Sequence, residues 1–283
     1  MILQCEAERF LDEDLRYEDI SCTLVPSVET DADIFVKEPC VLSGTEMAET
    51  ILNYMGISYE KQADDGDRLS QGDVIFRLHG NSVSVLRAER LVLNFLSHLS
   101  GVATETSEYV SVAADACRKA GVGIVPKIAC TRKTMPGLRK YEKEAVRDGG
   151  GDAHRNDLSD CVMIKDNHIA VMGLENAVRS AREKASFTKK IDVETESPED
   201  AVSAAALGAD IVMLDNMRPD MIRKTVRMLE EAGLRDRIIL EASGGIHKGN
   251  LEEYAVTGID VISISAIVTQ AKWIDISLDV RQS

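Results

Sequence analysis

The second part of the chain alternates between short apolar strands and helices, and this alternation constrains the fold more than any other feature. Helical segments fill the gaps between the strands, among them 198–207, for which Ser197 is a candidate N-cap, and 219–232. Such alternation is typical of parallel βα units. It predicts an α/β fold with an incomplete, open barrel of about six parallel strands. The candidate strands are 124–128, 161–164, 191–194, 210–214, 238–241 and 261–264.

The first hundred residues show a different pattern, in which short extended runs are mixed with helical ones. Segments 33–37 and 74–78 have the composition of strands. Segments 46–55 and 85–99 repeat apolar residues at helical spacing. At 283 residues the chain also exceeds the usual size of a single core. We therefore predict an α+β domain followed by the barrel.

Composition excludes several classes of protein. A formal net charge of −15 argues against a general nucleic-acid binder, because phosphate backbones are bound by clustered Lys and Arg. No run approaches the roughly 18 to 20 apolar residues that a membrane span needs, and Met1 to Phe10 is too polar for a signal peptide. The six cysteines are scattered without Cys-x-x-Cys pairs, so we expect reduced thiols. We predict a cytoplasmic protein that binds neither nucleic acid nor membranes.

The exception to the acidic charge is a basic stretch at 131–155. It holds seven Lys or Arg and four Asp or Glu, so it carries +3 while the rest of the chain carries −18. A basic island in an acidic protein indicates an anionic ligand, although a solvated helix face is the ordinary alternative. For Arg139, Lys140, Lys143 and Arg147, which fall on a predicted helix, we expect the solvated face.

Polar or charged groups stand at the ends of the predicted strands or just past them. In a parallel βα barrel, the loops that carry reactive groups gather at the carboxyl ends of the strands. Each group alone could be a surface charge, a helix cap or an ordinary turn, but their equivalent positions predict that they share one mouth. In chain order they are Thr131-Arg132-Lys133, Lys165-Asp166-Asn167-His168, Glu194, Asp215-Asn216, Ser243-Gly244-Gly245 and Ser265.

Two kinds of anionic ligand fit these residues. Glu194 and Asp215 could share a magnesium ion through carboxylate oxygens, and magnesium would imply a polyphosphate. The Ser243-Gly244-Gly245 loop could bind a phosphate through its backbone N–H groups and the start of a helix expected near Lys248. The basic groups suit a small dicarboxylate, because arginine forks match carboxylates in two-point geometry. These groups are Arg132, Lys133, His154, Arg155 and Lys165.

The basic stretch is part of a longer recognisable motif. Residues 131–169, TRKTMPGLRKYEKEAVRDGGGDAHRNDLSDCVMIKDNHI, resemble the signature region of the quinolinate phosphoribosyltransferases. The similarity extends to 89–104 (ERLVLNFLSHLSGVAT), 209–216 (ADIVMLDN) and 240–246 (LEASGGI), and with weaker matches it covers nearly the whole chain.

The resemblance implies a domain organisation and an assembly. An N-terminal α/β sandwich domain would occupy 1–103 and would be rejoined by the C-terminal tail 272–283. The open α/β barrel at 104–271 would be the catalytic domain. The resemblance also implies a homodimer or homohexamer whose active sites lie at subunit interfaces.

The implied reaction joins quinolinate to phosphoribosyl pyrophosphate and gives nicotinate mononucleotide, pyrophosphate and CO2, a step of NAD biosynthesis. The quinolinate-binding basic residues of the family match Arg132, Lys133, His154 and Arg155, and an arginine from the neighbouring subunit matches Arg90. The phosphoribosyl pyrophosphate site matches Lys165, Glu194, Asp215, Ser243 and Gly244, with the two acids facing Mg2+. By this resemblance Lys165, Glu194 and Asp215 are the expected catalytic residues.

Departures from the family pattern leave alternatives open. The chain has Ser265 and Thr269 where the family usually has glycine and histidine in a phosphate-contacting region, and 15–19 replaces an LGxGD-like segment. The Ser265 hydroxyl could itself donate to a phosphate. One alternative is a paralogous phosphoribosyltransferase acting on another aromatic acid, such as nicotinate or the substrate of the molybdenum-operon relatives, but the intact 164–168 run favours quinolinate. Another is a non-catalytic binding barrel, which the retained Lys165, Glu194 and Asp215 disfavour.

Overall fold

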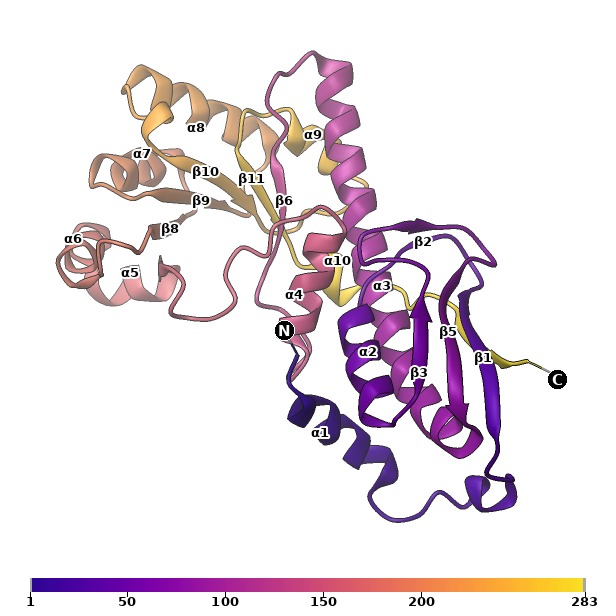
Figure 1. Cartoon of the computed structure of the whole chain (residues 1–283). Coiled ribbons are helices and arrows are strands. Elements are labelled where there is room, and N and C mark those ends of the chain that lie inside the picture. The colour runs from indigo at the N-terminus through magenta and orange to yellow at the C-terminus, as the bar shows by residue number, and fades with distance from the viewer. Residues whose placement is uncertain (1, 282–283) are drawn as a thin grey trace. The chain divides into compact units, whose positions relative to one another are not determined.

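The computed structural model describes residues 2–281, which form two compact units (Figure 1). The first unit comprises residues 2–107, 144–150 and 271–281 of the described chain, and the second comprises 108–143 and 151–270. Relative to the division expected from the sequence, the segment 144–150 groups with the first unit. The last two residues of the expected C-terminal tail lie outside the described part.

An antiparallel sheet is the centre of the first unit. Its order is β12-β1-β5-β3, formed by Ile276–Val280, Glu29–Val36, Val74–Asn81 and Ser58–Lys61. Alternate residues of β1, namely Ala32, Ile34 and Val36, are buried, as expected for a sheet with one face on a core. β12 brings the C-terminal segment back to β1, with Ile34 opposite Leu278.

Short elements complete the first unit. The helices are α1 (Gln4–Leu15), α2 (Thr45–Tyr54) and the 3-10 turn η1 (Ser21–Leu24), and a small ladder pairs β2 (Cys40–Val41) with β4 (Arg68–Leu69). The predicted helix at 46–55 is α2, and the predicted strands at 33–37 and 74–78 lie largely within β1 and β5.

Helix α3 (Ser82–Ala120) is 39 residues long, begins in the first unit and ends in the second. The predicted helical segment 85–99 lies inside it. Gly101 of α3 allows close approach of the C-terminal segment, since a Cβ there would overlap the carbonyl oxygen of Lys272. Within residues 2–281, no helix combines the length and the apolar composition needed to span a bilayer.

The second unit contains a six-stranded parallel sheet of order β6-β11-β10-β9-β8-β7. Because β6 and β7 stand at the two ends of this order, the sheet is open, and the predicted open α/β fold is confirmed. In chain order the strands are β6 (Lys127–Cys130), β7 (Val162–Ile164), β8 (Ile191–Thr195), β9 (Ile211–Asp215), β10 (Ile239–Ser243) and β11 (Val261–Ile264).

Helices alternate with these strands, as the sequence predicts. In Figure 1, α6, α7 and α8 lie along the outer side of the sheet, and α7 packs on β8, β9 and α8. Ser197 caps α7 by accepting a hydrogen bond from the backbone N–H of Asp200, as predicted. The helical elements are α4 (Arg139–Asp148), α5 (Asp166–Met172), α6 (Leu174–Lys184), α7 (Pro198–Ala206), α8 (Pro219–Glu231), η2 (Arg235–Arg237), α9 (Leu251–Ala255) and α10 (Ala266–Thr269).

One predicted strand is displaced along the chain. The sequence predicts it at 124–128, whereas β6 runs from Lys127 to Cys130. Ile124 and Val125 are exposed, and Pro126 cannot donate to a sheet ladder, so the strand starts only after it. The shift places the end of β6 directly before Thr131 and Arg132.

Candidate active site

A cavity of about 540 Å³ lies at the carboxyl ends of the parallel strands in the second unit. Ten of the predicted site residues line it: Arg132, Lys133, His154, Arg155, Lys165, Glu194, Asp215, Ser243, Gly244 and Ser265. The eleventh, Arg90, is an exposed residue of α3 in the first unit and is not among the residues that line the cavity. Most of the strand-end groups therefore share one mouth within this chain, whereas Asp166, Asn167 and His168 are exposed and are not among the residues that line it.

The strands supply polar side chains to the cavity at alternate positions. Successive residues of a strand point to opposite faces, so apolar residues can cover the outer face while polar ones point inward. On β8, Ile191 and Val193 alternate with Asp192 and Glu194, and all four are buried. The same alternation explains how other strands contribute Met213 and Asp215, Glu241 and Ser243, and Ser263 and Ser265.

An acidic pair faces a lysine at one side of the cavity. Lys165 follows β7, and its Nζ lies 2.5 Å from Oε2 of Glu194, near the carboxyl end of β8. Asp215, at the end of β9, accepts a hydrogen bond from the Asn216 side chain at 2.6 Å. Burial, together with the negative charge of Glu194, raises the pKa of Asp215. Two carboxylates that disfavour each other's charge are a donor set that suits a hard cation such as Mg2+.

The loop after β10 has a backbone that requires glycine. Gly244 has φ +92°, and a Cβ there would lie 2.6 Å from Cγ and 2.8 Å from the backbone nitrogen of Asn216. Asn216 is itself held in a left-handed conformation, and its N–H donates to the carbonyl of Ser243 at 2.8 Å. The loop is thus fixed against the end of β9.

The helix expected near Lys248 begins later and is short. α9 starts at Leu251 and spans five residues. The prediction that a helix start adjoins the Ser243-Gly244-Gly245 loop is therefore wrong. Any phosphate contact at this loop would come from the loop backbone and the side chain of Ser243.

Two guanidinium groups on the basic side of the cavity keep hydrogen-bonding capacity. Nε of Arg132 is buried and has no hydrogen-bond partner among residues 2–281. Arg155 is 8% exposed, and its guanidinium lies 3.0 Å from the sulfur of Met163, a weak acceptor. Lys133 is exposed at the rim. A carboxylate would be a stronger acceptor for these groups than any that the described chain gives them.

A buried polar cluster lies beneath His154, and its acids were not predicted as site residues. Nε2 of His154 lies 3.1 Å from Oε2 of Glu241, and the hydroxyl of Ser263 donates to the other oxygen of that carboxylate. Asp192 is fully buried, and neither of its oxygens has a hydrogen-bond partner in the described part of the chain. Burial, followed by the charge of Glu241, raises its pKa to about 8. Ligand atoms of His154, Asp192 and Glu241 lie within 4.8 Å of one another. Asp192 and Glu241 each lie two residues before a predicted site residue on the same strand, and this alternation was the sequence signal that they point to the same side.

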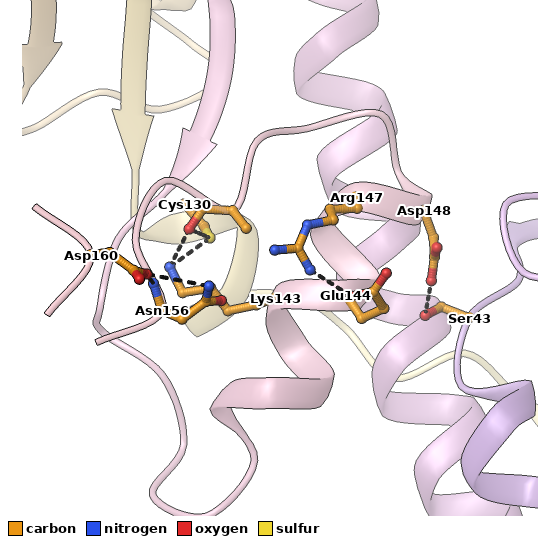
Figure 2. A network of polar contacts seen from close by, with 9 residues as sticks. Ser43, Cys130, Lys143, Glu144, Arg147, Asp148, Asn156 and Asp160 are labelled. Carbon is orange, nitrogen blue, oxygen red and sulfur yellow. Dashed lines mark hydrogen bonds and ion pairs between the residues drawn. The ribbon is translucent and has the colours of Figure 1, made fainter. Parts of the chain in front are cut away.

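The predicted solvated helix face is corrected at Lys143. The side chain is 1% exposed, and its ammonium donates to the carbonyl of Ala153 at 2.5 Å and to Sγ of Cys130 at 3.3 Å (Figure 2). Lys143 therefore ties α4 to the segment that carries His154 and Arg155. Arg147 conforms to the prediction, since it is exposed and pairs with Glu144 (Figure 2).

Comparisons with known proteins cover the whole of this architecture. Residues 19–100 match the family described as quinolinate phosphoribosyl transferase, N-terminal domain, and residues 102–279 match its C-terminal domain. A probable nicotinate-nucleotide pyrophosphorylase [carboxylating] of Methanothermobacter thermautotrophicus is 51% identical over 251 residues, 88% of each chain. The human nicotinate-nucleotide pyrophosphorylase [carboxylating] is 37% identical over 87% of this chain and 81% of its own.

A solved structure has the same fold. The nicotinate-nucleotide pyrophosphorylase from Francisella tularensis superposes with a TM-score of 0.90 at 35% identity, and the match covers 99% of this chain and 98% of that one.

Proposed function

This chain belongs to the quinolinate phosphoribosyltransferase family, and on that premise we propose which of its residues carry the reaction. The chain is an enzyme that converts quinolinate and phosphoribosyl pyrophosphate to nicotinate mononucleotide, pyrophosphate and CO2 in NAD biosynthesis. The pyridine nitrogen attacks the anomeric carbon while pyrophosphate leaves. Both reactants must therefore be held in one cavity, with the ring nitrogen in line.

The basic side of the cavity is the proposed quinolinate site. Arg132, Lys133, His154 and Arg155 would bind the two ring carboxylates, and the unused donors of the two arginines support this assignment. Carboxylates held at two points fix the orientation of the ring as well as its position. After transfer, the positively charged ring stabilises the electrons left by departing CO2, so no covalent enzyme nucleophile is needed.

Other residues of the same lining form the proposed phosphoribosyl pyrophosphate site. Lys165 would stabilise the charge that develops on the leaving pyrophosphate. Ser243, Gly244 and the hydroxyl of Ser265 would bind phosphate oxygens. Ser265 has φ −80°, a conformation open to any residue, so a side chain replaces the family's glycine there without backbone strain. Mg2+ bound by Glu194 and Asp215 would supply further positive charge to the pyrophosphate.

We further propose that the enzyme works in the cytoplasm as a homodimer or homohexamer, with Arg90 contributing to the active site of a neighbouring subunit. The exposed position of Arg90 on α3 leaves it accessible to another chain. Symmetric assembly is the common state of soluble oligomeric enzymes.

The observation that carries the assignment is one cavity that is lined both by Arg132 and Arg155 and by the acidic pair Glu194 and Asp215 with Lys165. To test it, the protein is incubated with phosphoribosyl pyrophosphate and Mg2+, with quinolinate or nicotinate as the acceptor. We expect nicotinate mononucleotide with quinolinate, together with equimolar CO2, and none after chelation of the metal. Turnover of nicotinate in preference to quinolinate would contradict the proposed dicarboxylate site.

A further inference from the structure

Glu241 is a buried acid that no step above uses. It lies in β10, is 1% exposed, and both of its carboxylate oxygens are engaged. One faces Nε2 of His154 at 3.1 Å, and the other accepts the hydroxyl proton of Ser263 from the neighbouring strand β11. The carboxylate is thus fixed from two sides, which is the arrangement of a group that orients another residue.

His154 is held by its backbone as well as by its ring. Its φ of 55° lies in the left-handed region, and its N–H donates to the side chain of Asp152 at 2.7 Å. A non-glycine residue in this conformation needs support from its surroundings. Nδ1 of the ring has no hydrogen-bond partner among residues 2–281, whereas the side chain belongs to the lining of the cavity. The ring can therefore bind Glu241 through one nitrogen and a ligand through the other.

The charges around His154 come from several elements. Glu241 on β10 is a carboxylate and Lys143 on α4 is positive, whereas Asp192 on β8 has a pKa raised to about 8 and is therefore mostly neutral at pH 7. Asp152 contacts the backbone of His154. Burial alone lowers the pKa of His154, but the hydrogen bond and charge of Glu241, with a contribution from Asp192, outweigh it and raise the pKa. Glu241 is buried, so a protonated ring also offsets its negative charge inside the unit.

We propose that Glu241 is a positioning residue that keeps His154 as an imidazolium, with Nδ1–H available to a substrate carboxylate and with Ser263 holding Glu241 in place. The inference rests on the proposed quinolinate site. It explains how an acidic side chain can increase affinity for an anion, because Glu241 keeps the ring of His154 protonated, and the protonated ring has an Nδ1–H donor. It also predicts that dicarboxylate binding weakens as pH rises through the titration of His154.

The test uses Glu241→Gln, which keeps the size of the side chain and removes its charge. Imidazole NMR of labelled histidines follows the titration of His154, assigned with His154→Asn. We expect the pKa of His154 to fall in Glu241→Gln and to stay unchanged in the matched control Glu253→Gln, an exposed acid on α9. Calorimetry should show quinolinate binding weakened about tenfold at pH 7.5, as expected for loss of one charge-assisted contact.

A pH series separates this role from a structural one. Below the pKa of His154 in the variant the ring is protonated again, so the loss of quinolinate affinity should shrink at pH 5.5. Ser263→Ala keeps the carboxylate of Glu241 but removes the hydrogen bond that holds it. It should lower the pKa of His154 and the quinolinate affinity by less than Glu241→Gln does. Ser263→Ala serves as the test if Glu241→Gln does not fold. An unchanged His154 titration, or an affinity loss independent of pH, would overturn the role of Glu241. Wild-type protein that neither binds nor converts quinolinate would instead overturn the proposed function.

Discussion

Arg155 is a buried arginine whose guanidinium has only a weak hydrogen-bond acceptor within the described chain, so a ligand carboxylate could bind it. Its guanidinium is 8% exposed and contacts the sulfur of Met163 rather than an oxygen. Replacing it with alanine should raise the quinolinate KM by about ten- to a hundredfold, the range for one charge-assisted carboxylate contact. The KM for phosphoribosyl pyrophosphate should change little. Steady-state kinetics with each substrate varied in turn measures both values.

A matched control distinguishes the loss of a contact in the cavity from the loss of one positive charge anywhere in the unit. Arg227→Ala removes an exposed arginine of α8 in the same unit and should leave both KM values unchanged. If Arg155→Ala raised both KM values equally, Arg155 would be supporting the whole cavity rather than the dicarboxylate site.

Residues at the carboxyl ends of strands were predictable from the sequence, whereas residues nearer the middle of strands were not. Lys165, Glu194 and Asp215 stand where a barrel places reactive groups, so position and chemistry agree. Asp192 and Glu241 lie inside parallel strands, where burial on both faces normally selects apolar residues. Their inward direction depends on which face the helices cover, and that is a property of the assembled sheet.

At the scale of elements, the loop after β10 depends on one glycine more than on the other. Gly244→Ala would push a Cβ against Asn216, whereas a Cβ at Gly245 meets nothing within 4 Å and faces only its φ of +64°. We expect Gly244→Ala to lower kcat/KM for phosphoribosyl pyrophosphate by tenfold or more, since a shift of the loop displaces its phosphate donors. Gly245→Ala should cost only about 1 kcal/mol of backbone strain. Equal effects of the two changes on kcat/KM would show that the fit against Asn216 is unimportant.

Helix α4 ends at Asp148, a partly buried carboxylate whose ionisation is disfavoured by its burial. Asp148 accepts a hydrogen bond from Ser43 at 2.7 Å (Figure 2), and burial raises its pKa to about 6. Because the folded-state pKa is above the ordinary 3.8, its stabilising contribution is full below about pH 4 and is lost as pH rises through 6. Asp148→Asn should therefore stabilise the protein by about 1 kcal/mol at pH 7.5, after allowance for solvent screening, and have little effect at pH 4.

Thermal unfolding midpoints at the two pH values measure this prediction. Asp236→Asn, at an exposed position in η2, controls for the loss of one negative charge from an acidic protein. If Asp148→Asn raised the unfolding midpoint equally at pH 4 and pH 7.5, the stabilisation would come from packing of the new side chain and not from loss of the charge.

Two errors in the sequence-based elements have physical causes. The strand expected at 124–128 begins at Lys127 because Pro126 separates the apolar Ile124 and Val125 from the ladder. Lys143 was expected on a solvated helix face because charges surround it in the sequence. Its partners, the carbonyl of Ala153 and Sγ of Cys130, come from other segments and become apparent only in the folded chain.

At the scale of the whole molecule, Arg90 is the predicted site residue that is not among the residues lining the cavity of its own chain. Its match to an interfacial arginine of the family makes it a test of assembly. Arg90→Ala and Lys165→Ala should each be inactive, but after subunit exchange a mixed dimer has one site with both changes and one site with neither. About a quarter of wild-type activity should then return from an equal mixture, since half of randomly exchanged dimers are mixed and each has one intact site.

The control for this experiment is a pair of changes within one cavity. Lys165 and Glu194 lie 2.5 Å apart in the same chain, so mixing Lys165→Ala with Glu194→Gln leaves a defect in every site and should restore nothing. The ordinary alternative is that Arg90 only pairs with an acid in solvent, in which case Arg90→Ala alone would be nearly fully active, because exposed ion pairs contribute little. If both single variants were inactive and their mixture stayed inactive after exchange was confirmed by mass spectrometry, Arg90 would act within its own chain. The activity of the mixture therefore decides whether each active site is built by one subunit or by two.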